Sequence, residues 1–226
     1  MKLYSYYRSS AAYRVRIVLN LKQVRYSTEP VHLIRNGGEQ HAAEYQSVNP
    51  QGLLPSLDIA VPNFNAVDSE SKPQIITQSG AIIEYLEEAF PQPALLPINL
   101  TQRAYVRTLT QIIACDMHPL NNLRVLQYLE ENFDCDGTEK MTWYHHWLEE
   151  GFAAFEALLT KKGSTHYCYN DQVTLADAYL IPQVYNALRF KLDMAPYPAI
   201  NRIYQHCIQL PAFLEAAPEQ QPDAGT

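Results

Sequence analysis

Two adjacent serines, Ser9 and Ser10, stand where a short stretch rich in β-formers, Lys2–Tyr7, gives way to the strongly helical AAYRVRIVLNLK. This pattern predicts a strand, a cap and a helix. A helix N-terminus presents unpaired N–H groups and about half a positive charge, so it favours an anion, and serine hydroxyls add donors. For a thiolate held there, each unit of pKa depression means about 1.36 kcal/mol of stabilisation. Serine is also a preferred N-cap without any ligand, so both interpretations stay open.

The junction itself offers no thiol. It reads Ser-Ser-Ala-Ala from Ser9, where a thioredoxin-type redox protein carries C-x-x-C, so disulfide exchange is excluded and any thiol must come from a ligand. Tyr4, Tyr6 and Tyr7 are close enough that a thiolate-activating tyrosine is an open alternative. The cysteines are scattered and expected to be reduced; they are Cys115, Cys135, Cys168 and Cys207.

Metal binding is not expected. The neighbouring histidines His145 and His146 point about 100° apart on a helix, and each has a glutamate four residues on, which is typical of a solvated polar face.

Charge and composition limit the function classes. The 226 residues carry a net charge of -7 without a polybasic run, which argues against nucleic-acid and membrane-surface partners. No apolar run approaches the roughly 20 residues of a membrane span, and no signal peptide is visible, so we expect a cytosolic protein. Residues 1–28 contain six basic and no acidic residues, which suggests either a small-anion site or a solvated surface.

The first 90 residues predict the order β-α-β-α-β-β-α, an α/β domain. After the first helix, Val24–Leu33 suits a strand, a helix surrounds Gln40–Ser47, and SLDIAV and PQIITQ suit a hairpin that encloses an exposed loop at 60–72. Ser79 is expected to cap a helix from Gly80 to Phe90.

The prolines of residues 91–97 break this pattern and begin an all-α region. We expect helices from the cap Thr101 to Leu129 and from Thr138 to Lys162, and a third from the capping-box-like TLAD at Thr174. The predicted domains are therefore 1–90 and 98–226, joined by the linker 91–97. The polar tail after Ala217 is expected to fray.

Several separated motifs occur along the chain: SSAAYRVRIVLNLK, NP-x-x-x-x-P, Q-S-x-A-I-I-E-Y-L-E-E, HPLNNLRVL, VTLADAYLIPQV and RFKLDMAPYP. In order and spacing they resemble the zeta class of glutathione transferases, the family of maleylacetoacetate isomerase and the bacterial maleylpyruvate isomerases. The resemblance runs from about Leu3 to Pro222. It implies a thioredoxin-like N-terminal domain followed by a helical C-terminal domain, the glutathione transferase fold, and a homodimer.

The resemblance implies glutathione as cofactor and a role for each matching residue. Ser9 would donate toward the glutathione sulfur, with Ser10 beside it as the second catalytic candidate. The backbone of Leu54, preceding a cis-proline at Pro55, would pair with the cysteinyl unit.

The carboxylates of glutathione would be held elsewhere. Gln78 and Ser79 would bind the γ-glutamyl carboxylate at a helix N-terminus, and Gln40 would lie near the glycyl end. A segment predicted to be helical would also contribute to ligand binding, the first two of its residues sharing one face; its residues are His118, Asn122 and Arg124.

Two arginines match residues that hold substrate carboxylates in the maleylpyruvate isomerase branch, Arg8 and Arg189. The planar guanidinium can bond a carboxylate through two hydrogen bonds. An alternative for Arg189 is a surface salt bridge with Asp193. Arg14 and Arg16 lie within the helix and are expected to be structural.

The resemblance implies glutathione-dependent cis–trans isomerisation of maleylacetoacetate in tyrosine and phenylalanine breakdown. Alternatives are a maleylpyruvate isomerase of the gentisate pathway, a conjugating or dehalogenating transferase, and a non-enzymatic binding protein of the same fold. The family usually has Ser-Ser-Cys where this chain has Ala11 in third place, which removes any role of a protein thiol at the site.

Overall fold

The computed structural model describes residues 1–59 and 73–225, so the predicted loop at 60–72 lies outside the described residues. Contacts divide the chain into two compact units. The first unit comprises Met1–Pro93 and Pro211–Thr226, and the second comprises Ala94–Leu210. The predicted second domain, 98–226, therefore extends beyond the second unit of the structure, because its last residues pack with the first.

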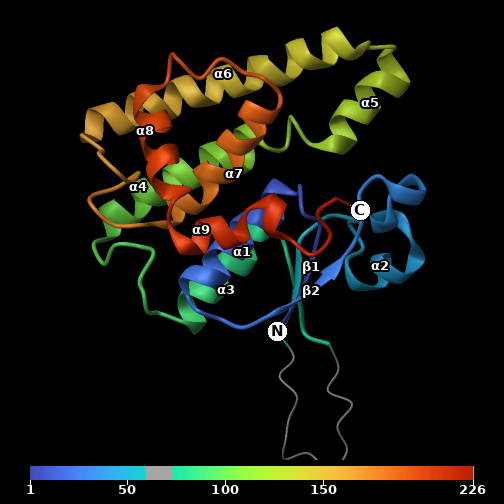
Figure 1. The fold of residues 1–226 in the computed structure, drawn as a ribbon, viewed down its shortest axis with the longest axis horizontal. Coiled ribbons are helices and arrows are strands. Elements are labelled where there is room, and N and C mark those ends of the chain that lie inside the picture. Colours follow the sequence, from blue (N-terminus) through green and yellow to red (C-terminus); the bar gives the residue numbers. More distant parts are fainter. Residues whose placement is uncertain (60–72, 226) are drawn as a thin grey trace, which may run out of the picture. The chain divides into compact units, whose positions relative to one another are not determined.

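The first unit is built on a four-stranded sheet in the order β2-β1-β3-β4. Strands β1 and β2 are parallel, and β3 is antiparallel to both β1 and β4. Helices α1 and α3 cover one side of this sheet and α2 lies on the other (Figure 1). The predicted β-α-β-α-β-β-α order is confirmed; its elements are β1 Lys2–Ser5, α1 Ser10–Leu21, β2 Ser27–Pro30, α2 Ala43–Val48, β3 Ser56–Asp58, β4 Ile75–Thr77 and α3 Ser79–Ala89.

Three of the six basic residues in the first 28 positions are buried. Arg14, Arg16 and Lys22 are 1%, 0% and 6% exposed. The Lys22 ammonium lies 2.5 Å from a Glu87 carboxylate oxygen and donates to the Pro93 carbonyl at 2.6 Å. Half of these cations therefore lie in the interior of the unit. They form neither a surface anion site nor a solvated surface.

The second unit is helical. Its elements are α4 Leu100–Gln111, a π-helical segment Ile112–Met117, α5 Leu123–Phe133, α6 Gly137–Lys162, α7 Leu175–Arg189 and α8 Pro198–Cys207. No helix within residues 1–59 and 73–225 is both long enough and apolar enough to cross a membrane.

The predicted single helix from Thr101 to Leu129 is wrong at its start and in its middle. Asn99 is the cap, since its side-chain oxygen accepts the N–H groups of Thr101 and Gln102. The helix ends before Pro119, which has no N–H to donate to an earlier carbonyl. Helix α5 then begins at a new cap, Asn122.

The predicted capping box at the start of α7 is confirmed. Asp177 is fully buried, and its carboxylate accepts the Thr174 N–H at 2.8 Å, the Thr174 hydroxyl at 3.0 Å and the Cys168 N–H at 2.8 Å. Burial raises the pKa of the Asp177 carboxyl, and these hydrogen bonds act in the opposite direction. One carboxylate thus caps α7 and fixes the segment before it.

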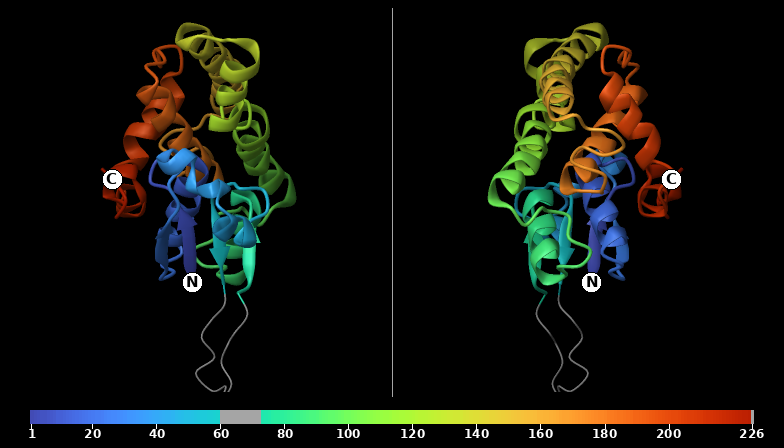
Figure 2. Two further views of the ribbon diagram at one scale, coloured as in Figure 1. Left: turned by 90° about the vertical axis from the view of Figure 1, so that its right-hand side faces the viewer. Right: turned by 90° about the vertical axis from the view of Figure 1, so that its left-hand side faces the viewer.

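The C-terminal segment forms α9 Pro211–Ala216 and a 3-10 turn Pro218–Gln220. The prediction that the tail after Ala217 frays is wrong, because this turn lies within that tail. Figures 1 and 2 show this segment, in red, beside α1 in blue. Side chains of α1 donate to three of its backbone carbonyls: Tyr13 to Phe213 at 3.5 Å, Asn20 to Ala212 at 3.1 Å and Arg16 to Ala216 at 2.9 Å.

Asp177→Ala should lower the free energy of unfolding by about 3 kcal/mol, because three donors lose their partner and two of them are buried amides. Asp136→Ala removes the equivalent box at the start of α6, where the cap is exposed, and should cost only about 1 kcal/mol. Urea denaturation of both variants measures the difference. Equal losses would contradict burial as its cause.

Candidate functional site

Ser9 is the N-cap of α1, and its hydroxyl oxygen accepts the Ala12 N–H at 3.2 Å. A hydroxyl that accepts in this way retains its own proton for donation. Capping and donation to an anion are therefore compatible at Ser9. Ser9 is partly exposed, whereas Ser10, in the first turn, is 4% exposed. Ser9 is the serine that a ligand can reach.

The predicted cis peptide bond joins Leu54 to Pro55. Strand β3 begins at Ser56, so the backbone of Leu54 lies outside the sheet ladder. An N–H and a C=O that the ladder does not use can pair with an extended peptide.

Gln78 and Ser79 begin α3, although the predicted cap at Ser79 is wrong. The N-cap is Gln78, with φ 69°, ψ 119° and no side-chain cap bond, and its amide donates to Gln51 at 2.7 Å. A non-glycine residue at positive φ costs about 1–3 kcal/mol. The first N–H groups of α3 have no side-chain cap in the described structure, and they can bind an anion instead.

Sheet register brings these groups to one edge. Tyr4 of β1 is opposite Ser56 of β3, and Ser56 is opposite Thr77 of β4. The end of β1, the start of β3 and the end of β4 therefore meet there. Ser9, Leu54 and Gln78 lie within four residues of those strand ends. Two helix N-termini and an unused backbone segment therefore share one side of the first unit.

Gln40 is 6% exposed and lies in a 3-10 turn, Glu39–His41. Its amide nitrogen lies 3.0 Å from the His41 ring and 3.4 Å from the Leu33 carbonyl. Its side-chain oxygen is buried without a hydrogen-bond partner among the described residues. A buried unpaired amide oxygen is rare in folded proteins and marks a place where a donor can be received.

The other predicted ligand-binding residues belong to the second unit. His118 follows the π-helical segment, and Asn122 caps α5 by accepting the Arg124 N–H at 3.2 Å. His118 and Asn122 do not share a helical face as predicted, because the chain between them is not helical.

Arg8 and Arg189 are both exposed and both lie over an aromatic ring. The Arg8 guanidinium is 4.9 Å from the Tyr7 ring centroid, and that of Arg189 is 4.6 Å from the Phe190 centroid. Among the residues that the structure describes, Arg189 forms no salt bridge with Asp193, so that predicted alternative is wrong; the Asp193 carboxylate accepts the Ala195 N–H. Stacking holds each guanidinium by its face and leaves its N–H edge for a carboxylate.

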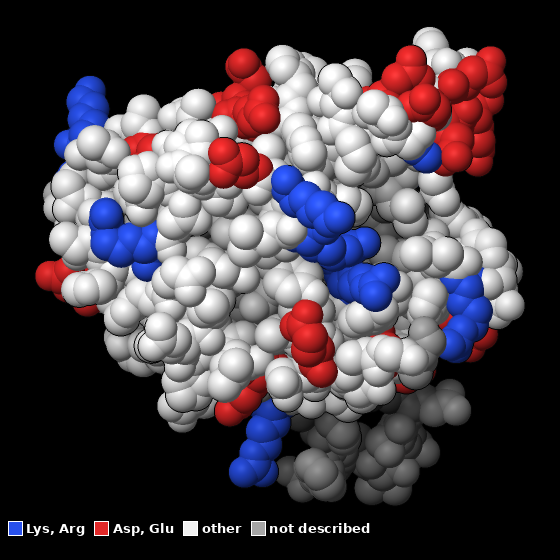
Figure 3. Space-filling view, turned by 45° about the horizontal axis from the view of Figure 1, so that its top comes forward, with Lys and Arg blue, Asp and Glu red and all other residues white. Residues whose placement is uncertain are grey.

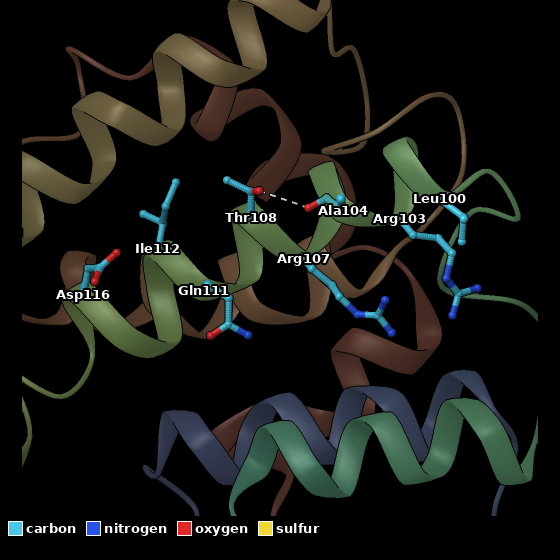
Figure 4. Close-up of a pocket in the computed structure, with 8 residues that line it drawn as sticks. All are labelled: Leu100, Arg103, Ala104, Arg107, Thr108, Gln111, Ile112 and Asp116. Atoms are coloured by element: carbon cyan, nitrogen blue, oxygen red, sulfur yellow. Dashed lines mark hydrogen bonds between the residues drawn. The ribbon is translucent and has the colours of Figure 1, made fainter.

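Sequence reasoning missed a pocket of about 510 Å³ along α4 and the segment after it. Arg103, Arg107 and Gln111 extend from one side of the helix, while Thr108 turns away and donates to Ala104 at 3.0 Å (Figure 4). The spacing of four residues between each of these side chains and the next was the available signal.

Acidic side chains gather where α5 meets α6 (Figure 3). Glu130, Glu131, Asp134 and Asp136 are all exposed, and Lys140 pairs with Glu130 at 2.6 Å. This surface of the second unit repels anions. Among the residues described, no three His, Cys, Asp or Glu side chains gather as metal ligands.

Comparisons with known proteins point to one family for both the N-terminal and the C-terminal part of the chain. The family model "Glutathione S-transferase, N-terminal domain" matches residues 3–94, and "Glutathione S-transferase, C-terminal domain" matches residues 145–211. A probable maleylacetoacetate isomerase of Vibrio cholerae is 48% identical over 98% of this chain and 97% of its own.

Solved structures are similar as well. The holo structure of maleylpyruvate isomerase, a bacterial zeta-class glutathione S-transferase, has a TM-score of 0.90 and 43% identity, with 100% of both chains covered. Maleylacetoacetate isomerase from Methylobacterium extorquens AM1, solved with malonate and GSH, has a TM-score of 0.89 and 35% identity, again with 100% of both chains covered.

Gln78→Gly should raise the free energy of unfolding by about 1 kcal/mol, because glycine adopts the positive φ without strain. Gln46→Gly makes the same exchange at an exposed position inside α2 and should lower it by about 1 kcal/mol. Chemical denaturation measures both. A loss of stability in the first variant would show that Gln78 is not strained.

Proposed function

Because the chain belongs to the zeta class of the glutathione S-transferase family, we propose that it is a glutathione-dependent cis–trans isomerase that converts maleylacetoacetate to fumarylacetoacetate in tyrosine and phenylalanine breakdown. The observation that carries the proposal is Ser9, a partly exposed helix cap with a hydroxyl proton still to donate. It stands at the sheet edge that also holds the backbone of Leu54 and the start of α3.

The first unit fits glutathione. The start of α3, with Gln78 and Ser79, receives the γ-glutamyl carboxylate on uncapped N–H groups. Leu54 next to the cis bond pairs with the cysteinyl backbone, and the unpaired oxygen of Gln40 suits a donor near the glycyl end. Membership of the zeta class further implies ligand binding by three residues of the helical region: His118, Asn122 and Arg124.

When bound, glutathione supplies a thiolate that adds to the conjugated double bond and leaves after rotation, so it is not consumed. Ser9 donates its hydroxyl proton toward the sulfur, and the first N–H groups of α1 add the positive end of the helix dipole. Both favour the thiolate over the thiol. Ala11, a methyl group in the place of a cysteine, leaves this chemistry untouched.

Arg8 and Arg189 bind the substrate carboxylates in this proposal. The Methylobacterium relative was solved with both malonate and GSH bound, which supports a dicarboxylate as the second ligand. Each guanidinium, stacked on its neighbouring ring, offers a donor edge that matches a carboxylate and can stabilise negative charge that develops during the reaction.

Maleylpyruvate is the rival substrate, favoured by the similarity to the holo maleylpyruvate isomerase. Turnover of both maleyl compounds, measured side by side, separates the two, and the proposal expects the larger kcat/KM for maleylacetoacetate. Net loss of glutathione during isomerisation would instead indicate a conjugating transferase. Failure to bind immobilised glutathione would favour a non-enzymatic binding protein.

We also propose a cytoplasmic homodimer. All four cysteines are free thiols, as suits a reducing compartment. At the start of α4, Ile98 and Leu100 are 94% and 79% exposed, and burying such side chains against a second copy is favourable. Sedimentation velocity should give twice the 25.8 kDa of one chain.

Ser9→Ala should lower kcat about a hundredfold, because one hydrogen-bond donor to the developing charge is lost. The lost cap should cost only about 1 kcal/mol of stability. Asp136→Ala, with a similar cap loss, serves as the control and should keep full turnover. Steady-state kinetics test both, and normal kcat in Ser9→Ala removes Ser9 from the chemistry.

Arg189→Met should raise KM for the dicarboxylate at least about tenfold, since a hydrogen bond between charged groups contributes roughly 1.5–3 kcal/mol. Glutathione affinity should not change. Arg25→Met, at an exposed position of the first unit, removes the same charge and should leave both constants unchanged. Kinetics and calorimetric titration give the two constants. Equal weakening of both ligands would place Arg189 outside the dicarboxylate site.

A further inference from the structure

The turn between β1 and α1 carries Ser9. It is closed by a hydrogen bond from the Ser9 N–H to the Tyr6 carbonyl at 2.9 Å. Its sequence, Tyr6-Tyr7-Arg8-Ser9, has none of the glycine, proline, asparagine or aspartate residues that favour tight turns, apart from the closing serine. Contacts from elsewhere in the fold must therefore hold it.

Two buried charged side chains, from different parts of the chain, form hydrogen bonds with the backbone of this turn. Arg16 donates to the Tyr7 carbonyl at 3.0 Å and to the Tyr6 carbonyl at 3.5 Å. Asp223 accepts the Tyr7 N–H at 2.9 Å across 216 positions of sequence. Arg16 is 0% and Asp223 5% exposed, so water does not compete for these bonds.

Hydrogen bonds fix the course of the C-terminal tail that carries Asp223. Arg16 also donates through Nε to the Ala216 carbonyl at 2.9 Å, so one guanidinium binds both the turn and the tail. The Gln221 side-chain amide donates to the Glu215 and Ala217 carbonyls at 3.0 and 2.9 Å. These bonds hold the chain in place just before Asp223.

We propose that Asp223 is a positioning residue for Ser9: its carboxylate fixes the Tyr6–Tyr7 peptide, and through it the direction of the Ser9 hydroxyl. A carboxylate accepting a backbone N–H is a short, strong hydrogen bond. Misplacement of a catalytic donor by about 1 Å can cost on the order of a hundredfold in rate. The catalytic consequence rests on the proposed function, whereas the anchoring of the turn does not.

Three variants separate the hydrogen bond from the charge. Asp223→Ala removes the acceptor and the charge, and Asp223→Asn removes the charge but keeps an acceptor oxygen. Glu215→Gln, an exposed carboxylate of the same tail, is the control. Deletion of residues 222–226 repeats the loss without a new side chain in the interior, should Asp223→Ala fold poorly.

The first measurement needs no glutathione. Amide hydrogen exchange by NMR should show the Tyr7 and Ser9 amides at least about tenfold less protected in Asp223→Ala and in the deletion variant. Asp223→Asn should recover most of the protection, and Glu215→Gln should match the parent protein. Unchanged exchange at Tyr7 in both Asp223→Ala and the deletion would overturn the anchoring.

The second measurement is the pKa of bound glutathione, from the ultraviolet absorbance of its thiolate against pH. A displaced Ser9 stabilises the thiolate less, so the pKa should rise by about one unit in Asp223→Ala, with kcat lower and KM nearly unchanged. Asp223→Asn should restore values close to the parent. If Asp223 acted through its charge, both substitutions would lower this pKa. That result, or a lower melting temperature with an unchanged pKa, would overturn the proposal.

A parent protein that binds glutathione without isomerising either maleyl compound would refute the proposed function alone. The exchange and thiol pKa results would still decide the role of Asp223.

Discussion

The interior guanidinium of Arg16 is the interaction on which the first unit depends. Its three nitrogens donate to Ser5 at the end of β1, to the turn carbonyls of Tyr6 and Tyr7, and to Ala216 in the tail. A guanidinium has five N–H donors in a rigid plane, so it can satisfy several carbonyls that no regular element serves. Because Ser9 caps the helix that carries Arg16, Arg16 links the strand, the turn, the helix start and the tail.

These linked segments matter because they lie at the sheet edge where the chemistry is proposed to occur. Register places the end of β1, the start of β3 and the end of β4 together, and a helix N-terminus follows the first and the third of these. One N-terminus is capped by Ser9. The other begins at the strained Gln78 without a side-chain cap. Two positive helix ends on one side suit a ligand that carries both a thiolate and a carboxylate.

Electrostatics divides the basic residues into two classes. Arg14, Arg16 and Lys22 lie in the interior of the first unit, where Lys22 joins α1 to Glu87 of α3. Burying such charges is unfavourable unless partners satisfy them, so they specify how the elements meet rather than attract ligands. Arg8 and Arg189 are exposed and stacked on aromatic rings, which suits recognition of a carboxylate.

The sequence by itself determined the order of the elements, the Ser9 junction and the capping box at Thr174, because strand and helix periodicity and capping are local properties. Pro119 and Asn99 were also local signals: Pro119 marks the break that the predicted helix ran through, and Asn99 is the cap that was assigned to Thr101. Only the tertiary structure decided where the tail lies, that Gln78 rather than Ser79 caps α3, and that Arg16 and Asp223 hold the turn. The contacts of Arg16 with Ala216 and of Asp223 with Tyr7 join residues 200 and 216 positions apart. A carboxylate that far along the chain has no periodicity or cap to reveal its partner, because the partner is chosen only when the elements between them have packed.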